Sequence, residues 1–385
     1  MDCLDKYFIN SLFTSDYYVG YRALDVYLSR IILCIFGDME ITQYLQNSFR
    51  TVDEVVAHFN FHAQSKPLLT WMLKYLEQMG YLQSRHSAYK MTVATPDLIT
   101  IKKTISNIID LIPSVEIFVK LVDHVTLNID KFLLGKKSGG DILFVDKAAA
   151  ALWNDYFNNN FYGYSVLNYG VAYGITKWFS QTCGKSMLEI GSGTSGATIK
   201  VFQMMRDNNL LDSTDTIKLT DVTSSMLYLG NQNIIKDIKN PPAYEQRILD
   251  INKEFRDQGF QEESFDIIYG VNVLHIAHDL GFSLKNLYNR LNKDGILVIA
   301  ETTRPAGSRA LHHEIIFNML ETYYSVKLDP EMRPTHGFLT KDIWIRNFEK
   351  AGLRNIDCIT ELEQHDQLDF DVKALHSFLV LKGQK

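Results

Sequence analysis

The sequence predicts an α/β fold, in which a mainly parallel β-sheet carries helices on both faces and follows a mostly helical N-terminal region. From residue 185 onward, short apolar segments alternate with amphipathic segments of about 10–15 residues, as expected for strands that alternate with helices. A glycine-rich stretch directly follows the first of these strand segments. Residues 1–95, in contrast, carry apolar side chains at the three- and four-residue spacing of helices.

Composition narrows the class of protein. The 385 residues are 46% hydrophobic and 22% charged, which is typical of a globular protein. The net charge of −6 and the lack of a Lys/Arg-rich block disfavour nucleic acid and anionic membranes as partners. Four widely spaced cysteines favour thiols in a reducing compartment over disulfides or a zinc site. The N-terminus lacks the basic segment of a signal peptide, and the longest apolar run, residues 31–36, is too short to span a bilayer. We therefore expect a cytoplasmic protein.

The N-terminal module, residues 1–95, follows a winged-helix pattern. Thr51 and Glu54 form a capping box that predicts the start of one helix, and residues 66–79 predict another. Residues 81–92 then predict a two-stranded hairpin. Because the expected recognition helix carries only two lysines, the pattern favours a dimerisation or lid module over DNA binding.

Residues 96–182 predict further helices, which we expect to act as a linker and lid over a substrate pocket. Their Tyr-, Phe- and Asn-rich part, residues 153–173, is suited to covering a ligand or to packing between domains. The catalytic domain is expected at 183–385, with a second lid inserted at about 303–340. In that insertion, Arg309 or Arg333 could meet a phosphopantetheine arm, but solvent exposure is the favoured interpretation for both. The insertion also holds adjacent His312, His313 and Glu314, whose side chains would point apart on a helix, so no metal site is expected.

The catalytic domain is predicted element by element. Strands are expected at residues 186–190, 216–222, 265–271, 296–301, 356–360 and 375–383, with a further strand ending at Asp250, and helices at residues 198–210, 281–295 and 340–352. Ligands bind such sheets where the carboxyl end of a strand meets its helix.

The glycine-rich stretch at residues 188–196, LEIGSGTSG, occupies that position after the first strand. Gly191 and Gly193 allow the backbone to turn sharply and to approach a ligand closely. The acid Glu189 precedes the glycines, where it is badly placed for a pyrophosphate and suits a positively charged ligand.

Two further acids end the next strands. Asp221 suits the two hydroxyls of a ribose. Asp250 suits an exocyclic amine, with Ile251 packing on the ring. A ribose, a base and an ammonium group without phosphate describe S-adenosylmethionine, which is therefore the expected cofactor.

Five stretches in order between residues 187 and 303 resemble the motifs of class I S-adenosylmethionine-dependent methyltransferases, in particular the C-methylating domains of polyketide synthases. They are LEIGSGTSGAT, LTDVTSSML, LDINKEFRDQGF, SFDIIYGVNVLHIAHDL and LNKDGILVIAETT. The resemblance covers about residues 130–383 and implies a Rossmann-like, seven-stranded sheet. It also implies that Met226, in the second motif, and Asn272, in the fourth, contact the cofactor or brace its loop. Ser195 stands where the family usually has glycine; serine is small, so binding is expected to survive.

The N-terminal module resembles the dimerisation module of small-molecule O-methyltransferases. That resemblance implies a free-standing enzyme whose copies pair through this module.

The residues expected to do chemistry follow the fourth and fifth strands. His275 can act as a base near neutral pH, and Glu301 ends the adjacent strand, within reach of the imidazole. A carboxylate on one ring nitrogen fixes the tautomer and stabilises the imidazolium. In the polyketide C-methylating family, a His–Glu pair at these positions is implicated in enolising a β-ketoacyl thioester, and we carry these roles onto His275 and Glu301. The alternative is a core histidine, with Glu301 paired to Arg304.

The resemblance thus implies methyl transfer to the α-carbon of a β-ketoacyl chain, on a small-molecule or carrier-protein-bound substrate. O-methylation of a hydroxyl or enol is the first alternative. A methyltransferase fold recruited for a non-methylating reaction and a winged-helix regulator that senses S-adenosylmethionine are the others.

Overall fold

The computed structural model describes residues 3–145, 147–158, 164–181, 185–304, 309–359 and 378–385. The chain forms two compact units, each made of separate stretches of sequence. Unit 1 comprises Met1–Leu12, Phe157–Pro305 and Ser325–Lys385, and unit 2 comprises Phe13–Tyr156 and Ala306–Tyr324.

Unit 1 is built on the predicted seven-stranded sheet, with strand order β6-β5-β4-β7-β8-β10-β9. The strands are β4 (Ser186–Ile190), β5 (Thr216–Asp221), β6 (Glu245–Ile248), β7 (Phe265–Val271), β8 (Leu291–Glu301), β9 (Arg354–Ile359) and β10 (Leu379–Gln384). Strands β6, β5, β4, β7 and β8 pair in parallel, whereas β10 runs antiparallel to both of its neighbours. The parallel strands therefore end at one edge, where the predicted site residues follow them.

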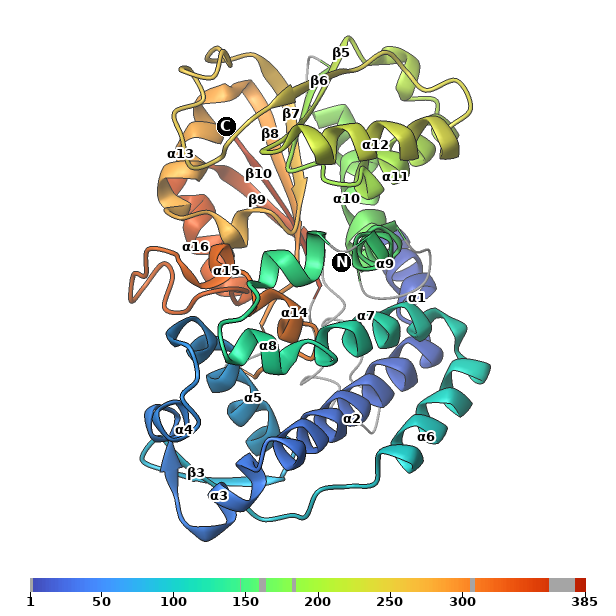
Figure 1. The fold of residues 1–385 in the computed structure, drawn as a ribbon. Helices are drawn as coiled ribbons and strands as arrows, with labels where there is room; N and C mark the ends of the chain where they lie inside the picture. Colours follow the sequence, from blue (N-terminus) through green and yellow to red (C-terminus); the bar gives the residue numbers. More distant parts are fainter. Residues whose placement is uncertain (1–2, 146, 159–163, 182–184, 305–308, 360–377) are drawn as a thin grey trace. The chain divides into compact units, whose positions relative to one another are not determined.

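Helices cover both faces of this sheet, as the alternating pattern predicted (Figure 1). They are α10 (Tyr164–Trp178), α11 (Gly196–Asp207), α12 (Ser224–Asp237), α13 (Leu280–Arg290) and α16 (Lys341–Ala351). Helix α1 (Cys3–Leu12) also belongs to unit 1, where Phe8 stacks on Tyr173 of α10. Helices α10, α11 and α12 lie together on one face, and α13 and α16 lie on the other. Strand β7 is buried along its whole length, as expected for a strand covered on both faces.

Unit 2 contains the predicted winged-helix pattern. Its elements are α2 (Ser15–Asp38), α3 (Ile41–Asn47), β1 (Arg50–Thr51), α4 (Val52–His58), α5 (Lys66–Gln78), β2 (Leu82–Arg85), β3 (Ala88–Met91), α6 (Leu98–Leu111), α7 (Glu116–Thr126), α8 (Ile129–Leu133), α14 (Glu314–Phe317), α15 (Glu321–Tyr324) and all but the last two residues of α9 (Lys147–Asn158). The capping box of Thr51 and Glu54 is present at the start of α4, and β2 and β3 form the predicted hairpin beside β1.

The compact units divide the chain differently from the boundaries expected at 95 and 182. Helix α10, expected in a lid, packs against the sheet of unit 1. Residues 306–324 of the expected lid insertion belong to unit 2, where Trp71 Nε1 donates to Glu314 at 3.3 Å and His312 bonds Asp25 at 3.1 Å. These pairings join residues far apart in the sequence, which is why composition and periodicity gave no sign of them.

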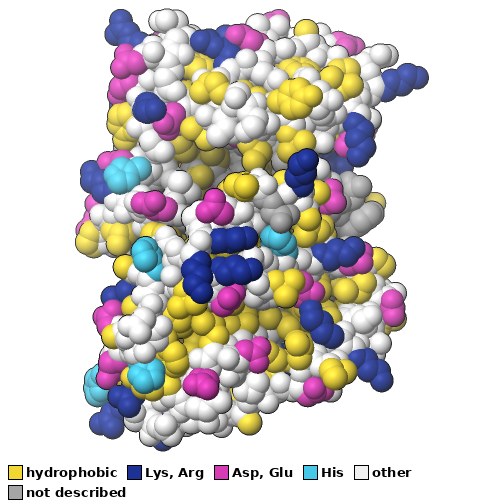
Figure 2. All heavy atoms as spheres, in the orientation of Figure 1, with side chains coloured by type: hydrophobic (Ala, Val, Ile, Leu, Met, Phe, Trp, Pro, Cys, Tyr) yellow, Lys and Arg dark blue, Asp and Glu magenta, His cyan; other side chains and the backbone are white. Residues whose placement is uncertain are grey.

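The surface carries charges of both signs. On the face drawn in Figure 2, basic side chains lie interspersed with acidic ones, in line with 39 Lys and Arg against 45 Asp and Glu in the chain. Within the described part of the chain, every helix is too short or too polar to cross a membrane.

Candidate functional site

The glycine loop after β4 has the geometry that its composition predicts. Gly191 and Gly193 have φ angles of +60° and +51°, in the left-handed region that favours glycine. A Cβ atom at Gly191 would lie 2.5 Å from Cγ2 of Val273, whereas one at Gly193 would meet nothing nearer than 3.9 Å. Gly191 is therefore needed for both conformation and space, and Gly193 for conformation.

This difference predicts unequal costs of alanine at the two glycines. Gly193→Ala is expected to cost about 1–2 kcal/mol of the free energy of unfolding, the price of an L-residue in the left-handed region. Gly191→Ala is expected to cost a further ~1–3 kcal/mol because its methyl group overlaps Val273. Urea denaturation of the two variants checks this, and equal losses would contradict the overlap.

Asp221, at the end of β5, is bonded to the glycine loop. Its Oδ2 accepts the backbone N–H of Gly193 at 3.0 Å, and its Oδ1 accepts that of Thr223, also at 3.0 Å. The residue is 8% exposed, so its carboxylate sits at the rim of the sheet. A turn that lacks Cβ atoms at Gly191 and Gly193, beside a rim carboxylate, suits the close approach of a cofactor that presents hydroxyl groups.

Glu189 is placed differently from the expectation that it faces a charged ligand. It is 1% exposed, and its Oε2 accepts hydrogen bonds from Thr198 Oγ1 at 2.5 Å and from Tyr269 OH at 2.9 Å. Burial raises the pKa of Glu189 to about 7, aided by the nearby Asp221 charge and opposed by the two hydroxyl donors. The carboxylate thus ties β4 to α11 and β7 within the protein.

The third acid, Asp250, lies in the loop after β6 and is partly exposed. Its Oδ2 is 3.1 Å from Lys253 Nζ, and its Oδ1 accepts the N–H of Asn252 at 3.0 Å. The next residue, Ile251, is 8% exposed and belongs to the apolar core of unit 1, so its side chain packs on the protein interior.

The two residues named from the motifs lie at a helix start and a strand end. Met226 is half-buried in the first turn of α12, where its N–H is 3.3 Å from the capping Thr223 Oγ1. Asn272 exchanges two hydrogen bonds with Thr302: Nδ2 donates to Oγ1 at 3.0 Å, and Oδ1 accepts the N–H at 2.7 Å. Asn272 therefore braces the ends of β7 and β8 against each other.

His275 and Glu301 are brought together at these strand ends. The imidazole Nδ1 is 2.9 Å from Oε2 of Glu301, and the two residues are 3% and 0% exposed. The other carboxylate oxygen, Oε1, accepts the N–H groups of Val273 at 3.2 Å and Leu274 at 2.9 Å. An ionised carboxylate only accepts, so an ionised Glu301 would take its hydrogen bond from Nδ1–H and leave the lone pair on Nε2 of the ring.

The alternative pairing of Glu301 with Arg304 does not occur. Arg304 Nε donates to the carbonyl oxygen of Phe338 at 3.2 Å. The ring of Phe338 lies against the imidazole of His275, with centroids 4.7 Å apart. The histidine is buried like a core residue, and its ring is oriented by a carboxylate.

The interpretation of Arg333 as solvent-exposed was wrong. The residue is 2% exposed, and its guanidinium donates to the carbonyl oxygens of His275 and Ala277. Arg309 lies in unit 2 and is partly exposed.

The adjacent His312, His313 and Glu314 are used inside unit 2. Glu314 accepts hydrogen bonds from Tyr323 OH at 2.7 Å and from the N–H of Leu311 at 2.8 Å. Among the residues that the structure describes, no group of three or more His, Cys, Asp or Glu side chains is arranged to hold a metal ion.

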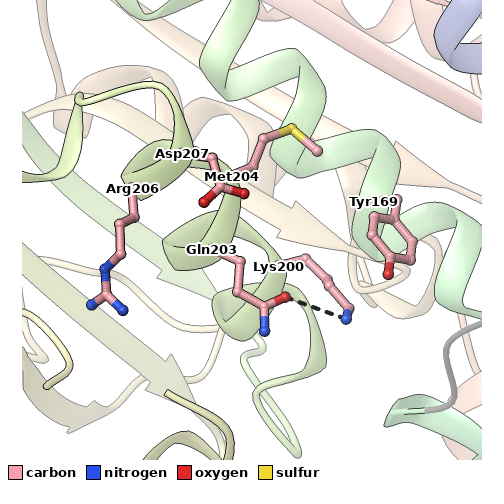
Figure 3. A pocket seen from close by; sticks show the side chains of 6 residues that line it. All are labelled: Tyr169, Lys200, Gln203, Met204, Arg206 and Asp207. Carbon is pink, nitrogen blue, oxygen red and sulfur yellow. Dashed lines mark hydrogen bonds between the residues drawn. The ribbon is translucent and has the colours of Figure 1, made fainter. Parts of the chain in front are cut away.

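A shallow depression of about 380 Å³ lies elsewhere on unit 1, between α10 and α11 (Figure 3). It is lined by Tyr169, Lys200, Gln203, Met204, Arg206 and Asp207. Its two basic groups are engaged: Lys200 Nζ lies 4.7 Å from the centroid of the Tyr169 ring, and Arg206 donates to two backbone carbonyls. The depression lies along the C-terminal part of α11, away from the glycine loop at that helix's start, and contains none of the predicted site residues.

Sequence reasoning missed Thr198, Tyr269 and Arg333. Thr198 follows the glycine loop and could have been suspected as a partner of Glu189 from its position in the first turn of α11. Tyr269 sits within an uninterrupted apolar strand and gave no signal. Arg333 binds backbone carbonyl groups, and because every residue has one, the sequence does not indicate which of them an arginine will contact.

Comparisons with known proteins agree with this geometry. Residues 181–352 match a family model described as methyltransferase domain. The highly reducing polyketide synthase rstn3 of Aspergillus nomiae is 31% identical over 175 residues, which are 46% of this chain and 7% of that synthase. The chain thus matches a small part of the length of this relative.

Two solved structures share the fold of nearly the whole chain. The CurJ carbon methyltransferase superposes with a TM-score of 0.83 at 19% identity, over 99% of this chain and 96% of that one. The CMeT domain of the citrinin polyketide synthase superposes with a TM-score of 0.71 at 15% identity, over 96% of each chain. The helical N-terminal module is therefore part of a fold that polyketide synthase domains also have, and it does not by itself mark a free-standing enzyme.

The strand order of the sheet, the glycine loop and the family match all indicate a methyltransferase. Residues 181–352 match the methyltransferase domain family, and the chain contains an S-adenosylmethionine-dependent methyltransferase of the class I fold.

Proposed function

We propose that this methyltransferase transfers a methyl group to the α-carbon of a β-ketoacyl thioester, with His275 as the base and Glu301 as the residue that orients it. The observation that carries the proposal is the buried contact of 2.9 Å between His275 Nδ1 and Glu301 Oε2 at the carboxyl ends of β7 and β8. A base is needed because the α-carbon of a β-ketoacyl group becomes nucleophilic only when it loses a proton.

Cofactor binding is assigned to residues on the strand ends. S-adenosylmethionine supplies, when bound, a methyl group made electrophilic by the positively charged sulfur. Gly191 and Gly193 would let the backbone approach it, Asp221 would accept the ribose hydroxyls, and Asp250 an exocyclic amine. Met226, Ile251 and Asn272 would support these contacts through the loops that they pack or brace. Glu189 would act from behind the glycine loop, through Thr198.

The chemistry of the His–Glu pair follows from its hydrogen bonds. Nε2 of His275 would take the α-proton, while the electron pair of the C–H bond moves into the enolate. Glu301 would stabilise the imidazolium, and the N–H groups of Val273 and Leu274 keep this carboxylate in place. The enolate carbon would then form the new C–C bond as the bond from methyl to sulfur breaks, which restores the ketone. Release of the proton to solvent would regenerate the base.

A substrate tethered to a carrier protein is supported by the relatives. The rstn3 protein is a polyketide synthase, the CurJ neighbour is a carbon methyltransferase, and the citrinin neighbour is the CMeT domain of a polyketide synthase. Polyketide synthases hold growing chains as thioesters, so the substrate class proposed here is a β-ketoacyl thioester on a phosphopantetheine arm.

Isotope labelling tests the proposal. The protein is incubated with S-adenosylmethionine carrying a trideuterated methyl group and with a 3-oxoacyl pantetheine thioester, and the product is analysed by mass spectrometry and NMR. We expect a deuterated methyl group on carbon 2. A product methylated on the enol oxygen would establish the O-methylating alternative in its place.

A blocked substrate provides the control. A 2,2-dimethyl-3-oxoacyl thioester has no α-proton to remove, and it is expected to remain unmethylated. Methylation of this compound at a rate equal to that of the parent would refute carbon methylation.

A further inference from the structure

One charged side chain reaches the turn that carries His275 from a distant part of unit 1. The guanidinium of Arg333 donates from Nη1 to the carbonyl oxygen of Ala277, at 2.5 Å, and from Nη2 to the carbonyl oxygen of His275. The side chain is 2% exposed, so these bonds form away from water. Burying an arginine is costly, and a buried arginine is expected to serve a specific contact.

Arg333 is itself held in a fixed position. Its N–H and carbonyl groups exchange hydrogen bonds with Asp329 at 2.8 and 3.0 Å, forming a tight turn. The Asp329 carboxylate accepts the N–H groups of Glu331 and Met332, each at 2.9 Å. The amide of Asn347, on α16, donates to the Met332 carbonyl at 2.8 Å. The guanidinium is therefore presented from a braced turn.

The two sides of the His275 turn are fixed by different residues. Glu301 accepts the N–H groups of Val273 and Leu274, on the side where the chain enters the turn. Arg333 binds the carbonyl groups of His275 and Ala277, on the side where the chain leaves it. A planar guanidinium holds two acceptors in a fixed relation, whereas the ammonium group of lysine is a single point charge.

We infer that Arg333 is a positioning residue for methyl transfer, which holds the backbone of the His275 turn so that Nε2 keeps its aim at the substrate while Nδ1 stays on Glu301. The inference rests on the proposed role of His275 as the base. Arg333 acts through the backbone and would not itself touch the reacting atoms.

Kinetics of variants test the inference. Arg333→Met is expected to lower kcat by about 100-fold, the effect of a misplaced catalytic group, with the KM for S-adenosylmethionine unchanged. Arg333→Lys keeps the charge without the two-pronged contact and is expected to lower kcat by about 10-fold. If Arg333→Met fails to fold, the kinetics of Arg333→Lys test the inference.

Arg290 offers a matched control. It is an arginine of unit 1 that is also 2% exposed, and it lies at the end of α13 near Glu262. Arg290→Met should reproduce the general cost of removing a buried arginine and leave kcat unchanged. If it lowers kcat as much as Arg333→Met does, or if Arg333→Met leaves kcat intact, the inference is overturned.

A measurement without substrate separates this inference from the proposed reaction. In protein labelled with ¹⁵N-histidine, the Nδ1–H proton bonded to Glu301 should give a downfield signal, assigned by its loss in His275→Gln. The signal should persist in Arg290→Met and shift or disappear in Arg333→Met. An unchanged signal in folded Arg333→Met would refute the positioning role, whichever acceptor the enzyme proves to methylate.

Discussion

Replacement of His275 by alanine is expected to lower kcat by about 100- to 10,000-fold, the usual contribution of a general base, while S-adenosylmethionine binding is retained. The cofactor contacts proposed above come from the ends of β4, β5 and β6, and His275 follows β7. Glu301→Gln should cause a loss in the same range, because glutamine has one acceptor oxygen: if it keeps the N–H groups of Val273 and Leu274, its NH2 group faces Nδ1, and no negative charge is left to stabilise the imidazolium. Single-turnover kinetics checks the loss of rate, and calorimetric titration with S-adenosylmethionine checks that cofactor binding is retained.

His278 provides the matched control for the base. This exposed histidine lies three residues after His275 and bonds the carbonyl oxygen of Ser325 at 3.1 Å. His278→Ala should keep kcat near that of the wild type. The assignment of His275 would be wrong if His275→Ala turned over substrate as fast as His278→Ala.

The second large effect concerns the pH dependence of stability. Burial raises the pKa of Glu189 to about 7 from an ordinary value of 4.5. The native state therefore binds this proton more tightly than the unfolded chain does, so the stabilisation is complete below pH 4.5 and is lost as the pH rises to about 7. Glu189→Gln, which stays uncharged, should become more stable than the wild type by about 3 kcal/mol above pH 7, at 1.36 kcal/mol per pKa unit.

Denaturant unfolding at several pH values measures this difference. The gap between Glu189→Gln and the wild type should widen from pH 4.5 to about 7 and stay constant above that range. Glu331→Gln, at an exposed carboxylate, serves as the control and should show no comparable widening. A gap that narrows with rising pH would mean that Glu189 is stabilised as the anion, as the expected contact with a positively charged ligand would require.

The sheet and its order of elements were predictable because their signals are local. Strands β4, β7 and β8 contain short apolar runs, and glycine or an acid stands at or beside the ends of β4, β5 and β8. The pairing of His275 with Glu301 was predictable for a related reason: the residues follow adjacent parallel strands, so the sheet brings them together. Helix α12 was not predicted, since its apolar residues are mixed with polar ones and only a few of them are buried.

Contacts between distant residues of unlike type could not be read from the sequence. Arginine is usually solvated, so the burial of Arg333 runs against its ordinary preference and depends on carbonyl groups about 56 residues away. The position of Glu189 at the end of β4 was predicted correctly. The direction of its carboxylate was not, because the hydroxyl groups of Thr198 and Tyr269 determine it. Side-chain direction at a strand end depends on such partners.

Because each unit is made of separate stretches of the chain, the fold limits how the protein can be divided into fragments and how its gene can recombine. The polypeptide passes between the units after residues 12, 156, 305 and 324. No single cut in the gene can therefore release the sheet from the helices of unit 2, and a recombination event at any one of these points would separate stretches that belong to the same unit. A fragment with unit 1 alone would need two internal excisions with rejoined ends, and one with unit 2 alone would need one. The two units are therefore expected to move together whenever this coding sequence moves between genes.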